Sequence, residues 1–209
     1  MSKGKKTETE IETTENGPVA SRRALLGALG LGGLAVAVPG IANAKHGRSK
    51  RRLSTDGFDV ACNGATFRFS GPADAGGNPA KGANFVVEGV IYESGTLIET
   101  DGLTPAGDPE YPDLVIGRWY CKGWFTQDMA AATTGTFVTT TQVYDFGDEP
   151  GARTLVSDGI ELIDFNVPWK RAITGGSGPF RKARGEAIQE AIGVNATGFF
   201  NFRFLMDLA

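Results

Sequence analysis

The chain has 209 residues, 41% of them apolar, and a formal net charge of −3 at pH 7. The charge is unevenly spread, because from Leu53 onward 11 Lys and Arg stand against 20 Asp and Glu, a net −9. An acidic body argues against nucleic-acid binding, which needs clustered positive charge. The one histidine, His46, precedes this body, which excludes Ser-His-Asp triads, Cys-His dyads and histidine-based zinc sites from it.

The first 44 residues indicate an export signal. Arg22 and Arg23 precede an apolar, Gly-rich segment at 24–38, and small residues follow up to Ala44. A charged region, a short apolar region and an A-x-A cleavage site occur in this order in signal peptides. The arginine pair resembles that of twin-arginine signals, which the twin-arginine translocase recognises and signal peptidase cleaves. About 15 apolar residues are too few for the roughly 20 that a membrane-spanning helix needs.

This signal divides the chain into three parts. Residues 1–44 are the expected signal with its polar leader, 45–57 a basic linker expected to be disordered, and 58–209 one domain. Cleavage after Ala44 leaves 165 residues, enough to bury a single core. We expect a secreted protein, or a periplasmic one where the source has an outer membrane.

From Phe58 onward the pattern predicts β-strands separated by Gly, Pro and Asp turns. The expected strands are 58–69 (one strand or two short ones), 84–97, 114–126, 136–146, 153–165, 169–174, 185–194 and 198–208. Seven or eight strands without a sustained helical period indicate an all-β sandwich or barrel. In the last strand Phe200, Phe202 and Phe204 share one face, which suits a closed antiparallel barrel.

Three segments resemble, in order, parts of dirigent proteins. Residues 172–187 (AITGGSGPFRKARGEA) resemble the glycine-rich hairpin of that family, and Ile116-Gly117-Arg118 with Gly123 resembles its Val-Gly-Arg…Gly strand. The strand ending at Phe146, with residues 154–159, resembles the next hairpin. This resemblance runs from about Asn84 to Leu208. It implies an eight-stranded antiparallel β-barrel of the type shared with allene oxide cyclases, no cofactor in the barrel, and assembly as a homotrimer.

The resemblance also implies a function. Plant dirigent proteins steer the coupling of phenoxy radicals or close rings through quinone methides, and allene oxide cyclases close a fatty-acid epoxide. A related chain would bind a small hydrophobic or phenolic molecule and guide its cyclisation or coupling, as a cofactor-free isomerase. The alternative is a non-catalytic barrel, ligand-binding or structural. An acid and an arginine sharing one pocket would favour the first, and a lumen packed with side chains the second.

Arg184 is the expected site arginine, because it matches the family's Ala-Arg-Gly and is implied to line the pocket. The alternative is a structural pairing with Glu186. Ring closure needs a proton donor, and a carboxyl in an apolar pocket can supply one. The candidate acids are Glu88, Asp158, Glu161 and Glu186. The hairpin itself carries no acid, unlike the tendency of plant members.

Aromatic side chains are the expected ligand contacts. Tyr92, Trp119 and Tyr144, with Glu186, are predicted to bind the ligand, although barrels also use aromatic rings to fill their interior. In the strand at 115–125 the drier face contains Gly117, Trp119, Cys121 and Gly123, and we expect it to face the lumen. The two glycines would leave room there for a ligand.

The remaining motifs are structural or open. Cys62 and Cys121 either form one disulfide, which export permits, or stay as two buried thiols, and their spacing matches no metal motif. The glycine-rich segment 175–178 lacks the Gly-Lys-Ser/Thr of a phosphate loop, so we expect a tight hairpin with positive φ at glycine.

Overall fold

The computed structural model describes residues 57–209, so the expected signal, the cleavage site and all but the last residue of the basic linker lie outside the described residues. Nearly all of the regular structure is β. The strands are β1 (Phe58–Ser70), β2 (Asn84–Glu93), β3 (Val115–Phe125), β4 (Thr136–Phe146), β5 (Thr154–Leu162), β6 (Trp169–Gly176), β7 (Gly185–Val194) and β8 (Phe200–Leu208). Each corresponds to a strand expected from the sequence.

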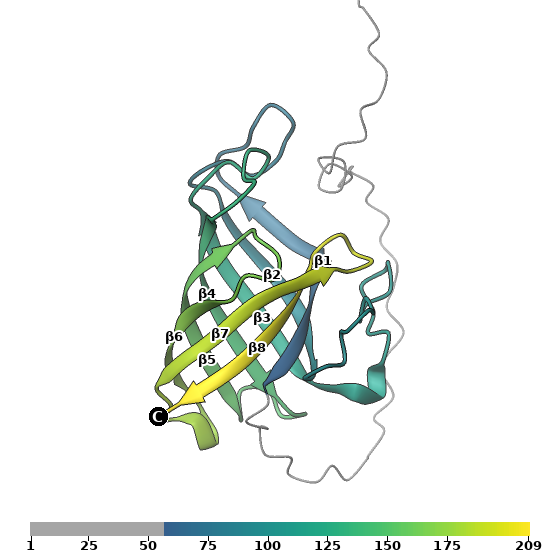
Figure 1. The fold of residues 1–209 in the computed structure, drawn as a ribbon, viewed down its shortest axis with the longest axis vertical. Coiled ribbons are helices and arrows are strands. Elements are labelled where there is room, and N and C mark those ends of the chain that lie inside the picture. The colour runs from purple at the N-terminus through teal and green to yellow at the C-terminus, as the bar shows by residue number, and fades with distance from the viewer. Residues whose placement is uncertain (1–56) are drawn as a thin grey trace, which may run out of the picture.

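The eight strands form one closed barrel (Figure 1). Each strand pairs antiparallel with the next along the chain, and β8 returns to pair with β1, Phe58 opposite Phe204 and Val60 opposite Phe202. Closure pairs the two end strands over Phe58–Ala61 of β1 and Asn201–Phe204 of β8, which leaves no fully open edge strand. The predicted eight-stranded antiparallel β-barrel is therefore confirmed.

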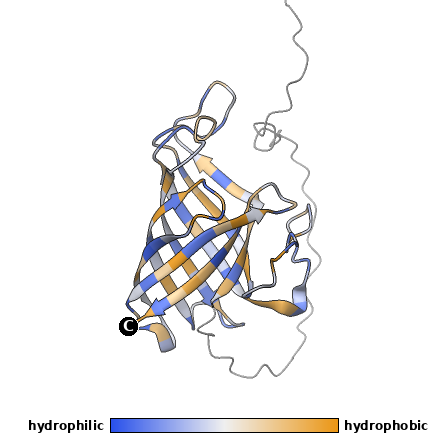
Figure 2. Ribbon diagram, in the orientation of Figure 1, coloured by the Kyte–Doolittle hydropathy of each residue, from blue (hydrophilic) through white to orange (hydrophobic). Residues whose placement is uncertain are grey.

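Alternation along the strands separates the lumen from the outer surface. In β3, Trp119 and Cys121 are buried, whereas Tyr120 and Trp124 between and beyond them are exposed. Figure 2 shows the same alternation of hydrophobic and hydrophilic residues along several strands. Side chains two residues apart share a face of a strand, so the predicted lumen face of β3 is confirmed.

The two lumen glycines of β3 do not leave room for a ligand. A Cβ at Gly117 would lie 2.3 Å from the Asp145 carbonyl oxygen, and one at Gly123 would lie 2.3 Å from that of Thr139. Both glycines instead allow the backbone of β4 to approach closely, a common reason for glycine inside a strand. This part of the sequence interpretation was wrong, because a glycine pattern does not show what fills the space beside it.

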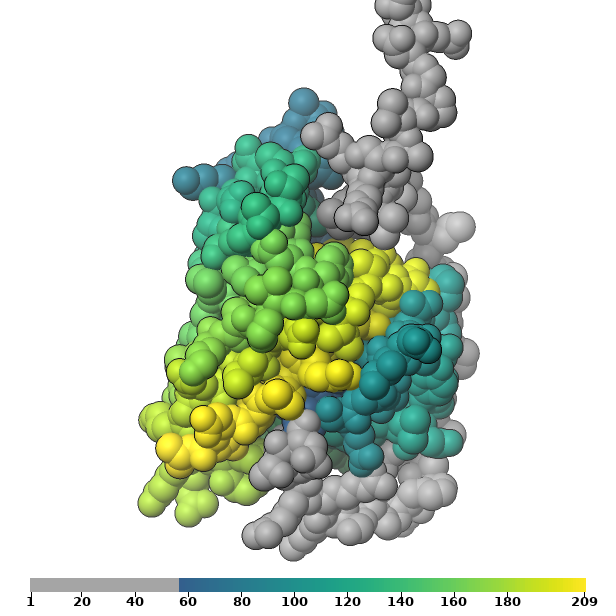
Figure 3. Space-filling model, viewed as in Figure 1, coloured from purple at the N-terminus to yellow at the C-terminus, as the bar shows by residue number. Residues whose placement is uncertain are grey.

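The long connection between β2 and β3 crosses the outside of the barrel. This segment, residues 94–114, is called the strap here, and it lies against the strand ends near β1 and β8 (Figures 1 and 3). It covers a small second core of Ala61, Val90, Tyr92, Leu97 and Leu103. The buried Asp59 carboxylate accepts hydrogen bonds from the Gly95 and Leu97 amides, which fixes the start of the strap.

The glycine-rich segment after β6 is not a tight hairpin. The chain passes through a short 3-10 turn, η3 (Gly178–Phe180), before β7 begins at Gly185. Gly178 has a φ of +53°, and a Cβ there would lie 2.1 Å from the Ala152 carbonyl oxygen, so the expectation of positive φ is confirmed. No helix in residues 57–209 has the length and apolar character needed to cross a membrane.

Candidate functional site

Aromatic rings line much of the lumen. Phe58 stacks on Phe204 with ring centroids 5.2 Å apart, and Phe202 packs edge-on to Phe204 at 6.2 Å. Edge-to-face and offset arrangements of this kind are the favoured geometries of aromatic pairs. Further rings joined to this network include Phe67, Phe85, Trp119, Phe125, Phe137, Tyr144, Phe146, Trp169, Phe199 and Phe200.

A carboxylate lies at the centre of this apolar wall. Glu161 of β5 is 4% exposed, and its Oε1 accepts hydrogen bonds from the Thr140 hydroxyl at 2.7 Å and Gln142 Nε2 at 2.8 Å. The same oxygen lies 3.6 Å from Nη1 of Arg171. A buried charge needs a partner and hydrogen bonds, and Glu161 has both. It is also the one candidate acid from the sequence that the fold brings into the lumen.

Arg171 of β6 supplies the opposite charge and is 1% exposed. Its Nε donates to the Ser157 hydroxyl at 3.0 Å, Nη1 to the Ile160 carbonyl at 3.1 Å and Nη2 to the Thr140 carbonyl at 3.0 Å. A Cβ at Gly159 would lie 3.3 Å from the arginine stem, so glycine there gives the stem its space. All three guanidinium nitrogens are used, which holds Arg171 rigidly inside the lumen.

Tyr144 and Trp119 extend the polar centre through Gln142. The Tyr144 hydroxyl donates to Gln142 Oε1 at 2.6 Å and lies 2.9 Å from the Ser157 hydroxyl. Trp119 Nε1 donates to the same Gln142 oxygen at 3.3 Å. Burial raises the pKa of Tyr144 well above the ordinary phenol value, so its hydroxyl stays protonated at neutral pH.

Both cysteines face the lumen as free, buried thiols. Cys121 Sγ lies 3.6 Å from Glu161 Oε1 and donates to it. Burial, and then the negative charge of Glu161, raises the pKa of Cys62 and of Cys121 well above the usual thiol value. A protonated thiol is a poor nucleophile, so both residues pack in the wall as small side chains, and Cys121 also donates to Glu161. Of the two states left open by the sequence, this structure contains the reduced one.

Two buried donors in the lumen have no partner. Trp169 of β6 is 6% exposed and Gln189 of β7 is fully buried, and neither Trp169 Nε1 nor Gln189 Nε2 meets an acceptor. The two residues are cross-strand partners in the β6–β7 ladder. Burying an N–H group without an acceptor costs about 1–3 kcal/mol, and here two residues that pair across the ladder each contain one.

The other predicted site residues lie outside the lumen. Arg184 is exposed, and its Nη1 donates to the neighbouring Ala183 carbonyl. Glu186 pairs with Lys170 at 2.6 Å rather than with Arg184. Glu88 is exposed on the outer face of β2, and Asp158 on the outer side of β5 accepts a hydrogen bond from Thr141. The fold therefore does not bring these four residues together with Glu161.

The three predicted aromatic contacts separate into two places. Trp119 and Tyr144 are in the lumen, 1% and 0% exposed. Tyr92 is also buried, but under the strap, where its hydroxyl donates to the Gly102 carbonyl at 2.6 Å. Burial raises the pKa of Tyr92 to about 12. Tyr92 thus holds the strap and does not face the lumen.

Sequence reasoning missed Arg171, Gln142 and Gln189. The signal was present in the alternation, because Trp169, Arg171 and Ile173 share one face of β6, and two of them are large and apolar. A charged or amide side chain in phase with apolar neighbours indicates a buried polar group. The resemblance instead drew attention to the charged residues after the glycine-rich segment.

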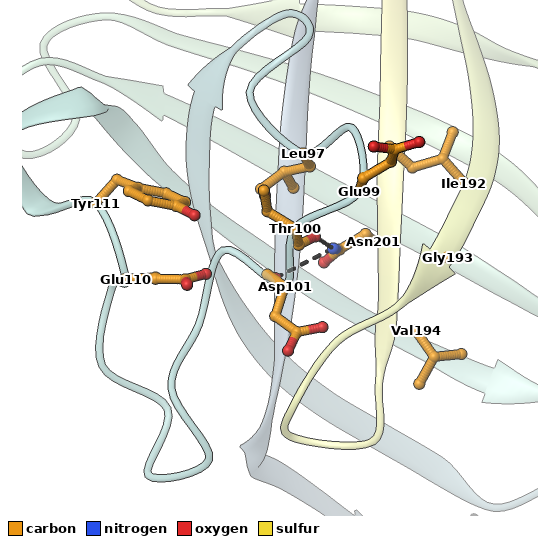
Figure 4. A pocket seen from close by; sticks show the side chains of 10 residues that line it. All are labelled: Leu97, Glu99, Thr100, Asp101, Glu110, Tyr111, Ile192, Gly193, Val194 and Asn201. Atoms are coloured by element: carbon orange, nitrogen blue, oxygen red, sulfur yellow. Dashed lines mark hydrogen bonds between the residues drawn. The ribbon is translucent and has the colours of Figure 1, made fainter.

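A surface pocket of about 400 Å³ lies between the strap and the β7–β8 end of the wall (Figure 4). The strap contributes the Glu99, Asp101 and Glu110 carboxylates, and β7 contributes Ile192 and Val194. Its polar groups also hold the strap, since Glu110 accepts from the Gly102 amide and Asn201 donates to the Thr100 and Asp101 carbonyls. Within residues 57–209, no three His, Cys, Asp or Glu side chains are placed to bind a metal ion.

No protein-family model and no curated protein matches the sequence. Several solved structures are similar in chain path, including the following two. One is a pyocyanin demethylase, at 14% identity and a TM-score of 0.43, covering 73% of this chain and 97% of that one. The other is the pterocarpan synthase dirigent protein GePTS1, at 16% identity and a TM-score of 0.44, covering 78% of this chain and 95% of that one.

Proposed function

We propose that this protein is an exported β-barrel that binds a small, largely apolar or aromatic molecule inside its lumen. The observation that carries the proposal is the polar centre of Glu161, Arg171 and Gln142 within an aromatic wall. Replacing a buried ion pair by well-packed apolar residues is often neutral or stabilising. A costly polar centre in an apolar interior is therefore better explained by binding than by folding. Ligand sites commonly combine an apolar wall with a few placed polar groups.

Guidance of a ring closure is the second candidate, because an acid and an arginine share the lumen. Glu161 and Arg171 lie 3.6 Å apart, and the protonated Tyr144 hydroxyl is joined to them through Gln142 and Ser157. In this arrangement Tyr144 and Cys121 are both protonated, but each already donates a hydrogen bond to a neighbour within the network. A bound molecule would have to displace one of these contacts to receive a proton. The geometry accordingly supports binding more directly than proton transfer.

Binding is tested with a neutral apolar dye and a matched pair of variants. N-phenyl-1-naphthylamine should bind the full mature protein saturably, with one site per barrel. Ala187 and Ala172 are on neighbouring strands, but Ala187 is buried on the lumen face of β7 and Ala172 is exposed on β6. Ala187→Leu should weaken dye binding at least ~10-fold, the scale of one displaced side chain contact of ~1.4 kcal/mol, while Ala172→Leu should not.

Two results would overturn the proposal. If Ala187→Leu and Ala172→Leu weaken dye binding equally, or if the wild type shows no saturable binding, the lumen holds no ligand. Ala187→Val serves if the leucine variant does not fold. Native mass spectrometry of protein from its own secretome then shows whether a small molecule is retained. Incubation of that molecule with the protein separates the two candidates, since a carrier returns it unchanged and a cyclase converts it.

A further inference from the structure

The lumen contains an amide relay with a fixed direction. Gln142 Oε1 accepts from Trp119 Nε1 at 3.3 Å, and Gln142 Nε2 donates to Glu161 Oε1 at 2.8 Å. An indole N–H can only donate and an ionised carboxylate can only accept. Rotating the Gln142 amide by half a turn would place oxygen against oxygen at Glu161 and donor against donor at Trp119. The two fixed partners therefore determine which end of Gln142 is nitrogen.

The relay passes this orientation to Gln189. Gln142 Nε2 also donates to Gln189 Oε1 at 3.2 Å. With its oxygen taken up by Gln142, the Gln189 amide presents its Nε2 to the rest of the lumen, and that nitrogen has no acceptor. Its cross-strand partner Trp169 presents a second N–H without an acceptor. The charge of Glu161 thus fixes, through Gln142, the orientation of the Gln189 amide, and Trp169 pairs with Gln189 across the ladder.

The surroundings of the two donors favour a flat group. Phe202 contacts both lumen tryptophans, with its ring centroid 6.1 Å from that of Trp119 and 6.5 Å from that of Trp169. On β7 the residues that flank Gln189 on the same face are the buried Ala187 and Ala191, whose methyl side chains crowd it least. An aromatic wall beside two donors suits a planar molecule with one polar edge.

The charge of the lumen selects a neutral partner. Arg171 is buried in the lumen, and Glu161 already balances its charge. The nitrogens of its guanidinium group already donate hydrogen bonds to four oxygens. A carboxylate or phenolate brought to Trp169 and Gln189 would add an uncompensated negative charge to an apolar interior, which is expensive. An alcohol or amine can accept, but its own hydrogens would then need acceptors. A carbonyl oxygen, with two lone pairs and no hydrogen, matches both donors.

We infer that Trp169 Nε1 and Gln189 Nε2 form a carbonyl-binding subsite, so that the ligand of the barrel is a neutral, flat molecule with a ketone-type or related carbonyl oxygen. This inference rests on the proposed function, since it names the ligand class of the same lumen. Trp169 and Gln189 are binding residues, while Gln142 and Glu161 orient Gln189.

The test compares two probes of similar shape, 2-acetylnaphthalene and 2-ethylnaphthalene, on the full mature protein. The ketone is better hydrated than the hydrocarbon, so an apolar cavity without donors prefers the hydrocarbon. We expect the ketone to bind ~10-fold more tightly. We also expect the infrared C=O stretch of the bound ketone to lie at lower frequency than in a hydrocarbon solvent, as hydrogen bonding weakens the C=O bond.

Two indole substitutions provide the matched control. Trp169→Phe removes the free N–H and should weaken ketone binding ~3- to 10-fold, the range for one neutral hydrogen bond, without changing hydrocarbon binding. Trp119→Phe removes an N–H that is already used by Gln142, so the ketone preference should remain. Gln189→Met should act as Trp169→Phe does and is available if that variant does not fold.

The outcomes separate the inference from the proposed function. If both probes bind equally and the wild-type C=O stretch is unshifted, the subsite is absent while the lumen still binds ligands. If the C=O shift persists unchanged in Trp169→Phe and in Gln189→Met, the carbonyl contacts other groups and the inference is wrong. If neither probe binds the wild type, both the carbonyl-binding subsite and the proposed function are wrong.

Discussion

Glu161 and Arg171 show how one buried pair couples stability to the site. Each compensates the charge of the other in an interior where a lone charge would be unstable. Each also fixes a neighbour by a hydrogen bond, Glu161 binding Gln142 and Arg171 binding Ser157. Breaking such a pair by removing one partner typically costs ~3–5 kcal/mol, because the remaining charge stays buried and uncompensated. The pair is thus the most sensitive point of the lumen.

We expect Glu161→Gln to lower the free energy of unfolding by ~3–5 kcal/mol, measured by urea denaturation. Combining it with Arg171→Met removes the stranded charge and should restore part of the loss. The control is Glu186→Gln, which breaks the exposed pair with Lys170 and should change stability little, as exposed pairs do. A loss no larger for Glu161→Gln than for Glu186→Gln would contradict the role given to the buried pair.

The buried thiols and phenols predict a decline in stability at alkaline pH. Burial raises the pKa of Cys62 and Cys121 above the ordinary 9.0, and that of Tyr92 to about 12 from 10.0. When the pH exceeds the ordinary pKa of such a group, the unfolded chain loses a proton that the folded protein keeps. The stabilisation is therefore complete below pH 9 and is lost as the pH rises from 9 towards the raised values, by up to ~1.4 kcal/mol per pH unit and group.

Urea unfolding between pH 8 and 11 measures this decline. In the double variant Cys62→Ala with Cys121→Ala, we expect the decline of the free energy of unfolding to begin about one pH unit higher, where the tyrosines of the unfolded chain ionise. Thiol counting without reductant is the companion measurement: two thiols should react in denaturant and neither in the folded protein. A wild-type stability that is flat from pH 9 to 10, or a count of zero thiols in denaturant, would refute the free-thiol structure.

Among the elements, the strap is held by its small apolar core and by polar contacts to β1, β2 and β8 rather than by strand pairing. Asp59 accepts from the Gly95 and Leu97 amides and is held by Arg203, whose Nε lies 2.9 Å away. Asn201 binds two further strap carbonyls from β8. Segments held by few contacts open locally at lower free energy than the strands they cover, so the strap should respond separately from the barrel.

We expect Asp59→Ala to release the strap while the barrel stays folded. Amide hydrogen exchange of residues 94–111 should become at least ~10-fold faster, with little change in β3–β6, and limited proteolysis should cut within the strap. Asp113→Asn is the matched control, because Asp113 belongs to the strap but is exposed. Uniformly faster exchange across all strands would instead show that Asp59 supports the barrel as a whole.

At the scale of the whole molecule, export remains a prediction that concerns residues outside the described part. Replacing Arg22 and Arg23 together by Lys should leave the precursor uncleaved in the cytoplasm, because the twin-arginine route recognises the pair. Cell fractionation with immunoblotting follows the precursor, and N-terminal sequencing of secreted wild type should begin at Lys45. Secretion of the double-lysine variant at the wild-type level would contradict this route.

By itself the sequence determined the positions of the strands, a number of seven or eight and which face of β3 is dry, because alternation with period two and turn residues are local signals. It also excluded histidine chemistry from residues 58–209. The tertiary structure decided the site. Glu161, Arg171, Gln142 and Gln189 are on four consecutive strands, β4 to β7, and only the pairing and curvature of these strands bring them into contact. Arg184 and Glu88 carry the same chemistry but project outside the lumen, a distinction of register and closure that residue type does not encode.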